Sequence, residues 1–507
     1  MTEIRIVLCW ILLYCASCIL PSAEAQDRAN CAKIKGNPKL ITDCVEALFS
    51  ENPVHLTVSS LPPGNGMALG VVVDQQRHYL TAFSPTQEAK FDSDPAKRQG
   101  RFESQASLGF VDAKLAFIGS TNLSWVATGS LSWLPATYRA GQRTDIHGVV
   151  HQCNRLGPLC TQSVLALHLE GTHQNLNTIS FYGFGPSSLN LKHTFAQNNT
   201  YGSATGSLPI FDWLNVTAGL QGIGTDLPSS SDPLAVSNSF APAQVPGLGT
   251  QPSYIHSQMG FSTRPTFDWN PVANDADDNH SGPLMKKNLI FTLSNGIQYH
   301  WYAAVGNSQY SFRQLAFNGD ETIRLGSNVR RVVYGNDVHG ALKTAFYHLL
   351  RRACGETDSL AGYKNPVLLK VTDQCDYGKL NLRFALTASQ TTGASAIPFY
   401  MQPTVGGSDI NSQVSLRGYP HYRFRDRNAT FAQVEYSIPV RDPFGLLVFY
   451  DAGTVGPTFR SLSYAHLRQD GGLGTTIRIQ GNVVAQAYLA WGAGHGPTLG
   501  YNFTKFF

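Results

Sequence analysis

Charged side chains are the scarcest ingredient of this sequence. Only 14% of its 507 residues are Asp, Glu, Lys or Arg, whereas soluble domains carry about 25%. The formal net charge of +4 is small for this length, so the charge balance does not indicate a nucleic-acid partner. Glycine (47), phenylalanine (27) and tyrosine (21) are plentiful instead. This composition is typical of a sheet of many strands, joined by turns, whose outer face meets an apolar medium.

Long apolar runs are missing beyond the first residues. After Ala25 no stretch approaches 18 consecutive apolar residues, which excludes a transmembrane helix there. Before it, Arg5 precedes the apolar run 6–20, and Ala23-Glu24-Ala25 forms an A-x-A cleavage site. We predict a signal peptide over residues 1–25 rather than a membrane anchor, because the run is shorter than the ~20 residues of a spanning helix. An exported chain without such a helix is able to span a membrane as a closed barrel.

Common catalytic motifs are absent. The sequence contains no G-x-S-x-G, H-E-x-x-H or Walker loop, so the enzyme classes that they mark have no support. We expect no enzymatic activity and no cofactor. An acidic segment at Asp275, Asp277, Asp278 and His280 has oxygen-rich spacing that would suit calcium. It lacks the Gly and closing Glu of a calcium loop, so a solvated loop is favoured and no metal site is expected.

Cysteine usage points to an oxidising compartment. Three of the nine cysteines fall within the predicted signal peptide, and the six that follow it contain no C-x-x-C spacing. An even number at short spacing after a signal peptide favours disulfides over free thiols or a metal site. The remaining six form three sequence-near pairs, which are Cys31 with Cys44, Cys153 with Cys160, and Cys354 with Cys375.

One stretch, residues 416–453, organises the rest. It begins with Leu-Arg-Gly-Tyr and continues into two segments of alternating polarity, each with one apolar face and one face that carries a carboxylate, Glu435 or Asp451. A buried carboxylate is costly unless a cation or donors meet it. Arg417 is the nearest candidate, because its guanidinium is able to bind both acids. Gly418 would let the backbone turn sharply beside it. The alternative is a surface hairpin with three unrelated solvated charges.

The order of these residues resembles a family signature. L-R-G-Y, then a strand glutamate, then Phe449-x-Asp451-x-Gly453 is similar to the motif set of the BamA/TamA superfamily of outer-membrane barrels, the bacterial surface-antigen family. In that superfamily a long loop folds back into the barrel, and its arginine meets acids of an E-x-R and an F-x-D-x-G motif. The resemblance extends from the loop to the C-terminus. In one departure, Ser437 replaces the arginine of E-x-R, which weakens or rewires that part. The implied loop lock comprises Arg417, Gly418, Tyr419, Glu435, Asp451 and Gly453.

Segments of alternating hydrophobicity recur along the chain from Leu56, with polar inserts at 85–101, 225–251 and 269–286. Short helices are expected at 39–49 and 342–350. Upstream strand candidates are 67–73, 107–118, 162–169, 179–184, 208–220, 287–305 and 380–387. Five more follow the L-R-G-Y loop, at 430–440, 445–453, 472–480, 483–491 and 498–507, with connections alternately short and long. We predict an all-β chain, a single transmembrane antiparallel β-barrel over residues 56–507 with a long inward-folded loop. The superfamily plan of 16 strands then requires eleven before that loop.

The two ends of the mature chain also carry information. We expect residues 26–55 to form a short periplasmic segment, which is too short for the POTRA module of superfamily members, so the resemblance implies a POTRA-less member. At the other end Tyr501, Phe503 and Phe507 share one strand face. This ending resembles the C-terminal signal that outer-membrane proteins present to the barrel assembly machinery.

The resemblance implies a bacterial outer-membrane barrel that assists assembly, insertion or translocation of polypeptides or lipid-linked clients. Its expected partners are outer-membrane lipid, the assembly machinery during biogenesis, and unfolded outer-membrane clients or a separate periplasmic partner. A non-catalytic structural barrel, acting as a narrow pore or surface antigen, is the main alternative. A soluble secreted β-sandwich or lectin is least favoured, because its outward faces would be polar.

Overall fold

The computed structural model describes most of the chain from residue 54 onward. The described ranges are 54–80, 108–137, 142–144, 150–152, 166–188, 191–211, 213–269, 284–333, 369–393, 395–441, 444–479, 482–494 and 496–503. The predicted signal peptide, the segment 26–53, both expected helices and the acidic segment around Asp275 lie outside these ranges, as does Phe507. The structure therefore does not test these predictions.

The predicted disulfides also fall largely outside the described ranges. Of their six cysteines, the structure describes only the backbone of Cys375. The five that lie outside are Cys31, Cys44, Cys153, Cys160 and Cys354. No disulfide is thus found within the described part of the chain, and the pairings Cys31 with Cys44, Cys153 with Cys160, and Cys354 with Cys375 stay predictions.

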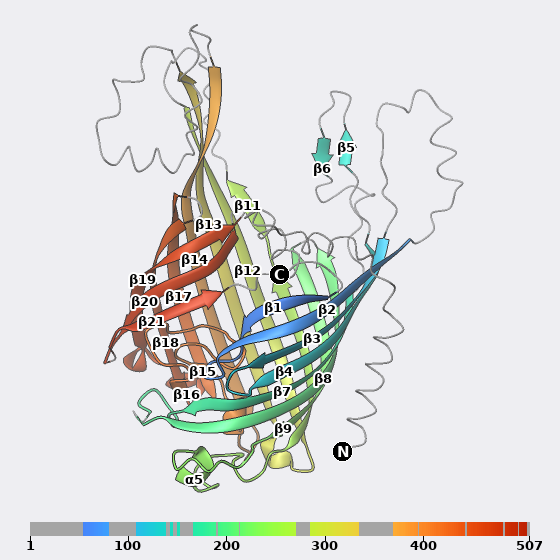
Figure 1. The fold of residues 1–507 in the computed structure, drawn as a ribbon, viewed down its shortest axis with the longest axis vertical. Coiled ribbons are helices and arrows are strands. Elements are labelled where there is room, and N and C mark those ends of the chain that lie inside the picture. Colours follow the sequence, from blue (N-terminus) through green and yellow to red (C-terminus); the bar gives the residue numbers. More distant parts are fainter. Residues whose placement is uncertain are drawn as a thin grey trace, which may run out of the picture.

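One antiparallel sheet contains nearly all of the described strands (Figure 1). Before the L-R-G-Y loop it comprises β1 (Val54–Ser60), β2 (Met67–Leu80), β3 (Leu108–Ser120), β4 (Trp125–Thr137), β7 (Ala166–Phe181), β8 (His193–Phe211), β9 (Leu214–Asp226), β10 (Ser253–Thr263), β11 (Thr266–Trp269), β12 (Leu284–Val305), β13 (Phe312–Val333) and β14 (Leu369–Thr391). After the loop come β17 (Asn428–Arg441), β18 (Phe444–Gly456), β19 (Arg468–Ile479), β20 (Asn482–Gly492) and β21 (Thr498–Phe503). Two short hairpins stand apart, β5 (Gln142–Thr144) with β6 (Val150–Gln152), and β15 (Thr404–Val405) with β16 (Phe424–Arg425).

The sheet has 16 successive strand positions, as predicted. It contains 17 strands, but β10 and β11 pair one after the other with the same strand, β12, and so share one position. Eleven positions precede the L-R-G-Y loop and five follow it. Each strand pairs with its neighbours along the chain. The resulting sheet curves around a lumen (Figure 1). Among the described residues no pairing joins β1, whose partner is β2, to β21, whose partner is β20.

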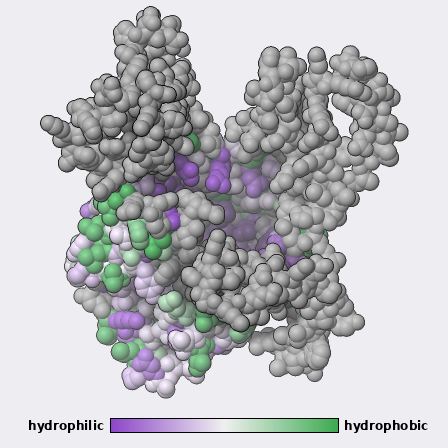
Figure 2. Space-filling view, turned by 45° about the horizontal axis from the view of Figure 1, so that its top comes forward, coloured by the Kyte–Doolittle hydropathy of each residue, from purple (hydrophilic) through white to green (hydrophobic). Residues whose placement is uncertain are grey.

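Alternation of side chains explains how the sheet separates an apolar outside from a lumen. On β18, Leu446, Val448 and Tyr450 are exposed, whereas Leu447 and Phe449 are buried. The predicted parity of β17 and β18 is therefore confirmed. Figure 2 shows hydrophobic residues on the outer face and hydrophilic residues gathered in the hollow. Within the described ranges, no helix has the length and apolar character needed to cross a membrane.

Two strand predictions upstream were wrong. Residues 208–220 were expected to form one segment, but β8 ends at Phe211 and β9 begins at Leu214, so they form a hairpin. The turn was missed because Trp213 interrupts neither the apolar character nor the parity of its neighbours. Residues 162–169 and 179–184 were expected to be separate, but β7 runs through both regions, from Ala166 to Phe181. The polar residues between them are those that a lumen-facing strand tolerates.

The connections alternate between the two ends of the sheet, because neighbouring strands are antiparallel. The end that holds α5 (Val236–Ser239) also holds the connections 392–427 and 457–467. The opposite end holds the start of β1 and the short connections 442–443 and 480–481. The strand ends that flank residues 81–107, 138–165, 270–283 and 334–368 also lie there. The predicted difference in length between the two ends thus holds for the C-terminal third but not for the whole chain.

A hydrophobic core closes the α5 end. Val236 and Val245 of the β9–β10 connection are fully buried, as is Phe399 of the 3-10 helix η3 (Phe399–Met401). They pack against Phe181 and Phe195 of the wall, with ring centroids of Phe399 at 5.4 and 4.9 Å from those two rings. The Phe399 N–H also donates to the Pro246 carbonyl at 2.9 Å. We name this cluster the cap.

Candidate functional site

The connection from β14 to β17, residues 392–427, folds into the barrel instead of extending away from it. Its β15–β16 hairpin brings Leu416 and Tyr419 into a buried cluster with Val455 of the wall. Leu416 is 0% and Tyr419 2% exposed. The Tyr419 hydroxyl donates to the backbone carbonyl of Gln469 at 3.2 Å. The L-R-G-Y tetrapeptide is therefore anchored against the inner surface of β18 and β19.

Arg417 meets both acids that the sequence assigned to it. Its Nε and Nη2 donate to Asp451 Oδ2 and Oδ1, each at 2.8 Å, and its backbone N–H donates to Asp451 Oδ2 at 3.2 Å. Nη1 donates to Glu435 Oε2 at 2.5 Å. Asp451 is 0% exposed and Arg417 7%. We name Arg417, Glu435 and Asp451 the arginine lock.

The surroundings of the guanidinium explain why this arrangement is stable. The Arg417 Cζ lies 3.6 Å from the centroid of the Phe449 ring and 5.9 Å from that of Tyr488, which gives the cation two aromatic faces. Burial by itself would lower the pKa of Arg417, but the hydrogen bonds and charges of Asp451 and Glu435 raise it above its ordinary value. The cation is therefore permanent, and removing an acid would leave it buried and partly unpaired.

Both glycines of the predicted lock are required for space. A Cβ at Gly418 would lie 2.7 Å from the Asp470 Cβ and 2.7 Å from the Gly492 nitrogen. A Cβ at Gly453 would lie 3.0 Å from atoms of Phe431 and of the inward loop. The expected turn is present, because residues 417 and 418 are in turn conformation and the Tyr419 N–H donates to the Leu416 carbonyl at 3.2 Å. Gly418 is not among the residues with positive φ, so the turn itself does not require glycine. Gly418 instead allows the loop backbone to touch the wall.

The departure at Ser437 is accompanied by a different arginine. Ser437 is buried on the inner face of β17, and Arg478 Nη2 of β19 donates to its hydroxyl at 3.4 Å. A guanidinium thus reaches the position that E-x-R would supply from β17, but it comes from two strands away. The motif comparison did not reveal this, because Arg478 is far from Ser437 in sequence.

A third acid was missed by the sequence reasoning. Asp470 lies directly opposite Asp451 in the β18–β19 register and is 4% exposed. The predicted strand began at residue 472, whereas β19 begins at Arg468. Asp470 shares the inward parity of Gly472 and Gly474, which was the available signal. A third acid thus lies buried beside the arginine lock, opposite Asp451.

Two further loop arginines, from the basic and aromatic run after Pro420, are also buried. Arg423 Nη1 donates to Ser188 Oγ at 2.5 Å, and its Cζ lies 5.0 Å from the centroid of the Tyr182 ring. Arg425 Nη1 donates to the Phe399 carbonyl at 2.6 Å. Burial lowers the pKa of Arg425 to about 10. Neither role was predicted, because the partners come from distant parts of the chain.

Of the predicted C-terminal signal, the structure describes Tyr501 and the backbone of Phe503. Tyr501 is 61% exposed and pairs with Ala487, and Phe503 pairs with Ala485. Tyr501 thus points outward, as an apolar outer face requires. The backbone of Cys375 lies in β14 opposite Ser327.

No family model matches this sequence, and the search of curated proteins finds no match. Solved structures do match. One is BamA from Haemophilus ducreyi lacking POTRA domains 1–3, at 11% identity and a TM-score of 0.45, covering 90% of this chain and 71% of that one. Another is CdiB from Acinetobacter baumannii, at 9% identity and a TM-score of 0.39, covering 87% of this chain and 56% of that one. The chain thus spans little more than half of CdiB. Its own strand order and inward loop assign it to the antiparallel β-barrels.

Proposed function

We propose that this chain is an outer-membrane β-barrel without enzymatic activity that assists assembly, insertion or translocation of polypeptides or lipid-linked clients. The observation that carries the proposal is the arginine lock beside an unjoined sheet edge. Strand edges without a partner present free N–H and C=O groups, and these pair readily with an incoming strand. Among the described residues β1 and β21 are such edges.

The inward loop contacts the strands next to one of these edges. The space around Gly418 is bounded by backbone atoms of Trp491 and Gly492 on β20, the neighbour of β21. Thr498, the first residue of β21, donates from its hydroxyl to the Gly418 carbonyl at 3.5 Å. The inward loop therefore supports the last two strands from the lumen side. A client strand that pairs with β21 would meet an edge whose position depends on Arg417.

The proposed partners follow from the surfaces. The exposed apolar residues of the outer face suit outer-membrane lipid. An unfolded client would pair with an edge strand, and a periplasmic partner would deliver it. The barrel assembly machinery would act during biogenesis.

The test is a deletion strain followed by quantitative proteomics of the outer membrane. We expect the deletion to lower the amounts of several other outer-membrane proteins. The wild-type chain should restore them, and Arg417→Ala should not. Asp320→Asn is a matched control, because Asp320 is an exposed acid of β13 that lines the small cavity beside Arg417 without bonding to it. Normal protein levels in the deletion strain would refute the assembly function.

A narrow pore is the second candidate, favoured by the space that the loop leaves. Cavities of about 610 and 210 Å³ lie against the loop within the lumen. Conductance in planar bilayers separates the two functions. If Arg417→Ala raises conductance sharply while other outer-membrane proteins stay at normal levels, the pore function replaces the assembly function.

A further inference from the structure

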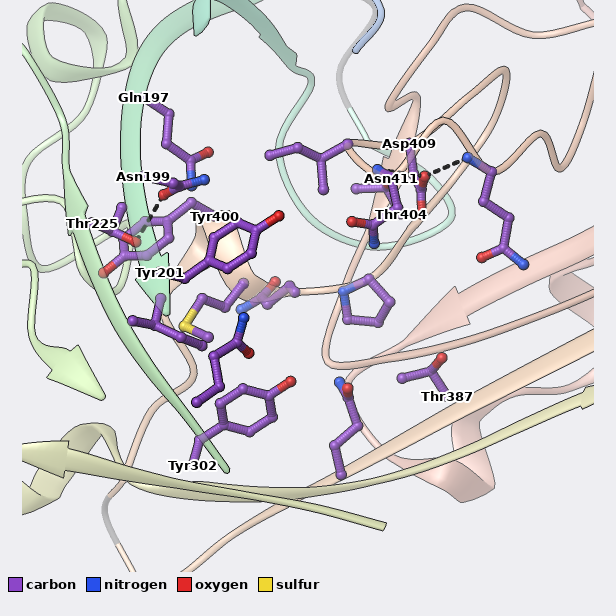
Figure 3. Close-up of a pocket in the computed structure, with 18 of the residues that line it drawn as sticks. Gln197, Asn199, Tyr201, Thr225, Tyr302, Thr387, Tyr400, Thr404, Asp409 and Asn411 are labelled. Carbon is purple, nitrogen blue, oxygen red and sulfur yellow. Dashed lines mark hydrogen bonds between the residues drawn. The ribbon is translucent and has the colours of Figure 1, made fainter. Parts of the chain in front are cut away.

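The larger lumenal cavity, of about 610 Å³, is not used by the proposed function. Its walls are β7, β8 and β9 and, across the lumen, β10, β12, β13, β14 and β17, and the inward loop forms its remaining side (Figure 3). At the α5 end it is bounded by cap residues such as Phe195 and Tyr400. Pockets of about 300–1,000 Å³ are typical of sites for small ligands.

Neutral hydrogen-bonding groups dominate the lining. Nine primary amides and nine hydroxyl groups line the cavity. The amides include Gln258 of β10 and Asn411 of the loop, and the hydroxyls include Tyr201 of β8 and Thr404 of the loop. Figure 3 shows the labelled side chains of the loop and of β8 facing one another across the space. Each amide offers a donor and an acceptor, so the lining suits a ligand that offers both in turn.

Few charged groups line the cavity, and its two acids are already paired within the protein. Glu170 contacts His168 at 3.5 Å and accepts from the Tyr201 hydroxyl at 3.3 Å. Asp409 accepts from the backbone N–H groups of Asn411 and Gln413 at 2.9 and 2.7 Å. Arg425 donates from Nη1 to the Phe399 carbonyl, and its Nε has no hydrogen-bond partner in the described part of the chain, but the side chain is only 3% exposed. The accessible part of the described lining therefore offers an anionic or cationic ligand little counter-charge.

Other ligand classes fit less well. An apolar ligand would strip water from the amides without replacing their hydrogen bonds, which is unfavourable. A peptide strand would need a sheet edge, but the wall strands around this cavity are paired on both sides. A neutral polyhydroxylated molecule has hydroxyls that donate and accept, and the faces of its rings are able to pack on a tyrosine such as Tyr201.

We propose that the lumenal cavity between β7–β9 and the inward loop is a binding site for a neutral oligosaccharide. The site is separate from the arginine lock, and its occupant would contact the wall and the loop at once. Binding would therefore hold the loop against β8 in addition to the anchoring by Arg417.

The test is calorimetric titration of the purified barrel in a zwitterionic detergent without a sugar headgroup. The probes are maltotriose, cellotriose, chitotriose and mannotriose, with trigalacturonate as a charged probe of similar size. We expect at least one neutral trisaccharide to bind, with trigalacturonate at least tenfold weaker. Gln258→Leu and Asn411→Leu, from wall and loop, should each weaken binding at least tenfold.

Gln298→Leu is the matched control. Gln298 lies on β12 with the inward parity of His300 and does not line the cavity, so its variant should bind as the wild type does. Failure of all four neutral probes with a barrel whose urea unfolding is normal would overturn the proposal, leaving a cavity filled by water only. Equal loss in the Gln258 and Gln298 variants would overturn it too. Neither result bears on the assembly function, which the proteomic experiment tests.

Discussion

At the scale of single residues, the molecule depends on one permanent cation. Arg417 forms three hydrogen bonds with Asp451 and one with Glu435, and the Phe449 ring covers one of its faces. A buried ion pair contributes little net stability relative to apolar residues, but breaking it leaves an uncompensated charge. The main effect of the lock is thus to make the position of the loop specific, because few other positions would give the Arg417 guanidinium its hydrogen bonds.

We predict that Asp451→Ala destabilises the docked loop by about 3–5 kcal/mol, because the guanidinium loses the acceptor of two of its N–H groups while it stays buried. Urea unfolding in liposomes measures the change. Asp320→Asn serves as the control and should alter stability by less than about 0.5 kcal/mol, as exposed substitutions usually do. A similar, small effect for both variants would contradict the role of the lock.

A partly buried acid of the inward loop, Asp409, predicts that the folding stability depends on pH. Burial raises the pKa of Asp409 above its ordinary value, although the N–H groups of Gln413 and Asn411 and nearby arginines oppose the shift. The folded state thus keeps this proton to a higher pH than the unfolded state. Its contribution to stability is full below about pH 4 and is lost as the pH rises through the folded pKa.

Asp409→Asn should flatten this dependence, because the amide keeps an acceptor for the turn without titrating. Urea midpoints at intervals from pH 4 to pH 8 would show a smaller decline in the variant than in the wild type. Parallel curves for the two proteins would exclude Asp409 as the source.

At the scale of elements, the cap distinguishes this barrel from an open cylinder. It joins the β9–β10 connection to the start of the inward loop around Phe399, which is fully buried. Three aromatic rings, those of Phe181, Phe195 and Tyr400, lie within 5.5 Å of its ring centroid.

We predict that Phe399→Ala lowers the free energy of unfolding of the cap by about 3–5 kcal/mol, the usual loss of stability when a large buried aromatic side chain is removed. Limited proteolysis should then cleave the 227–252 connection faster, and bilayer conductance should rise. Phe459→Ala is the control, because Phe459 is 59% exposed on the neighbouring connection. Unchanged cleavage in Phe399→Ala would show that the cap is held elsewhere.

The elements differ in how far the sequence predicts them. The five C-terminal strands were predicted closely, because short connections and strict alternation of side chains define them. The cap was not, since Val236 and Val245 lie in an insert rich in serine and proline that was expected to be a loop. Their partners on β7 and on η3 are far away in sequence. Similarly, the motif letters revealed Arg417, Glu435 and Asp451, whereas Asp470 and Arg478 become lock neighbours only through strand register.

At the scale of the whole molecule, the apolar outer face decides where the barrel resides. Val448 lies near the middle of β18 and is 55% exposed, whereas Phe444 begins the same strand and is 57% exposed. The two side chains are therefore almost equally exposed, but in a bilayer crossed by β18 they would lie at different depths.

We predict that Val448→Arg lowers folding stability in liposomes by about 2–4 kcal/mol, and Phe444→Arg by only about 0–1 kcal/mol, as expected for a midplane and an interfacial position. Equilibrium folding from urea into lipid vesicles measures both. Equal effects would show that the outer face of β18 does not lie across a bilayer as proposed.

The anchoring of the inward loop has a consequence for the order in which the chain matures. Gly418 rests on β19 and β20, and Arg417 on β17 and β18, all of which follow the loop in sequence. The loop therefore cannot dock until these later strands have formed. Docking of the tetrapeptide thus depends on a complete wall, and a wall that lacked one of these strands would leave the tetrapeptide undocked.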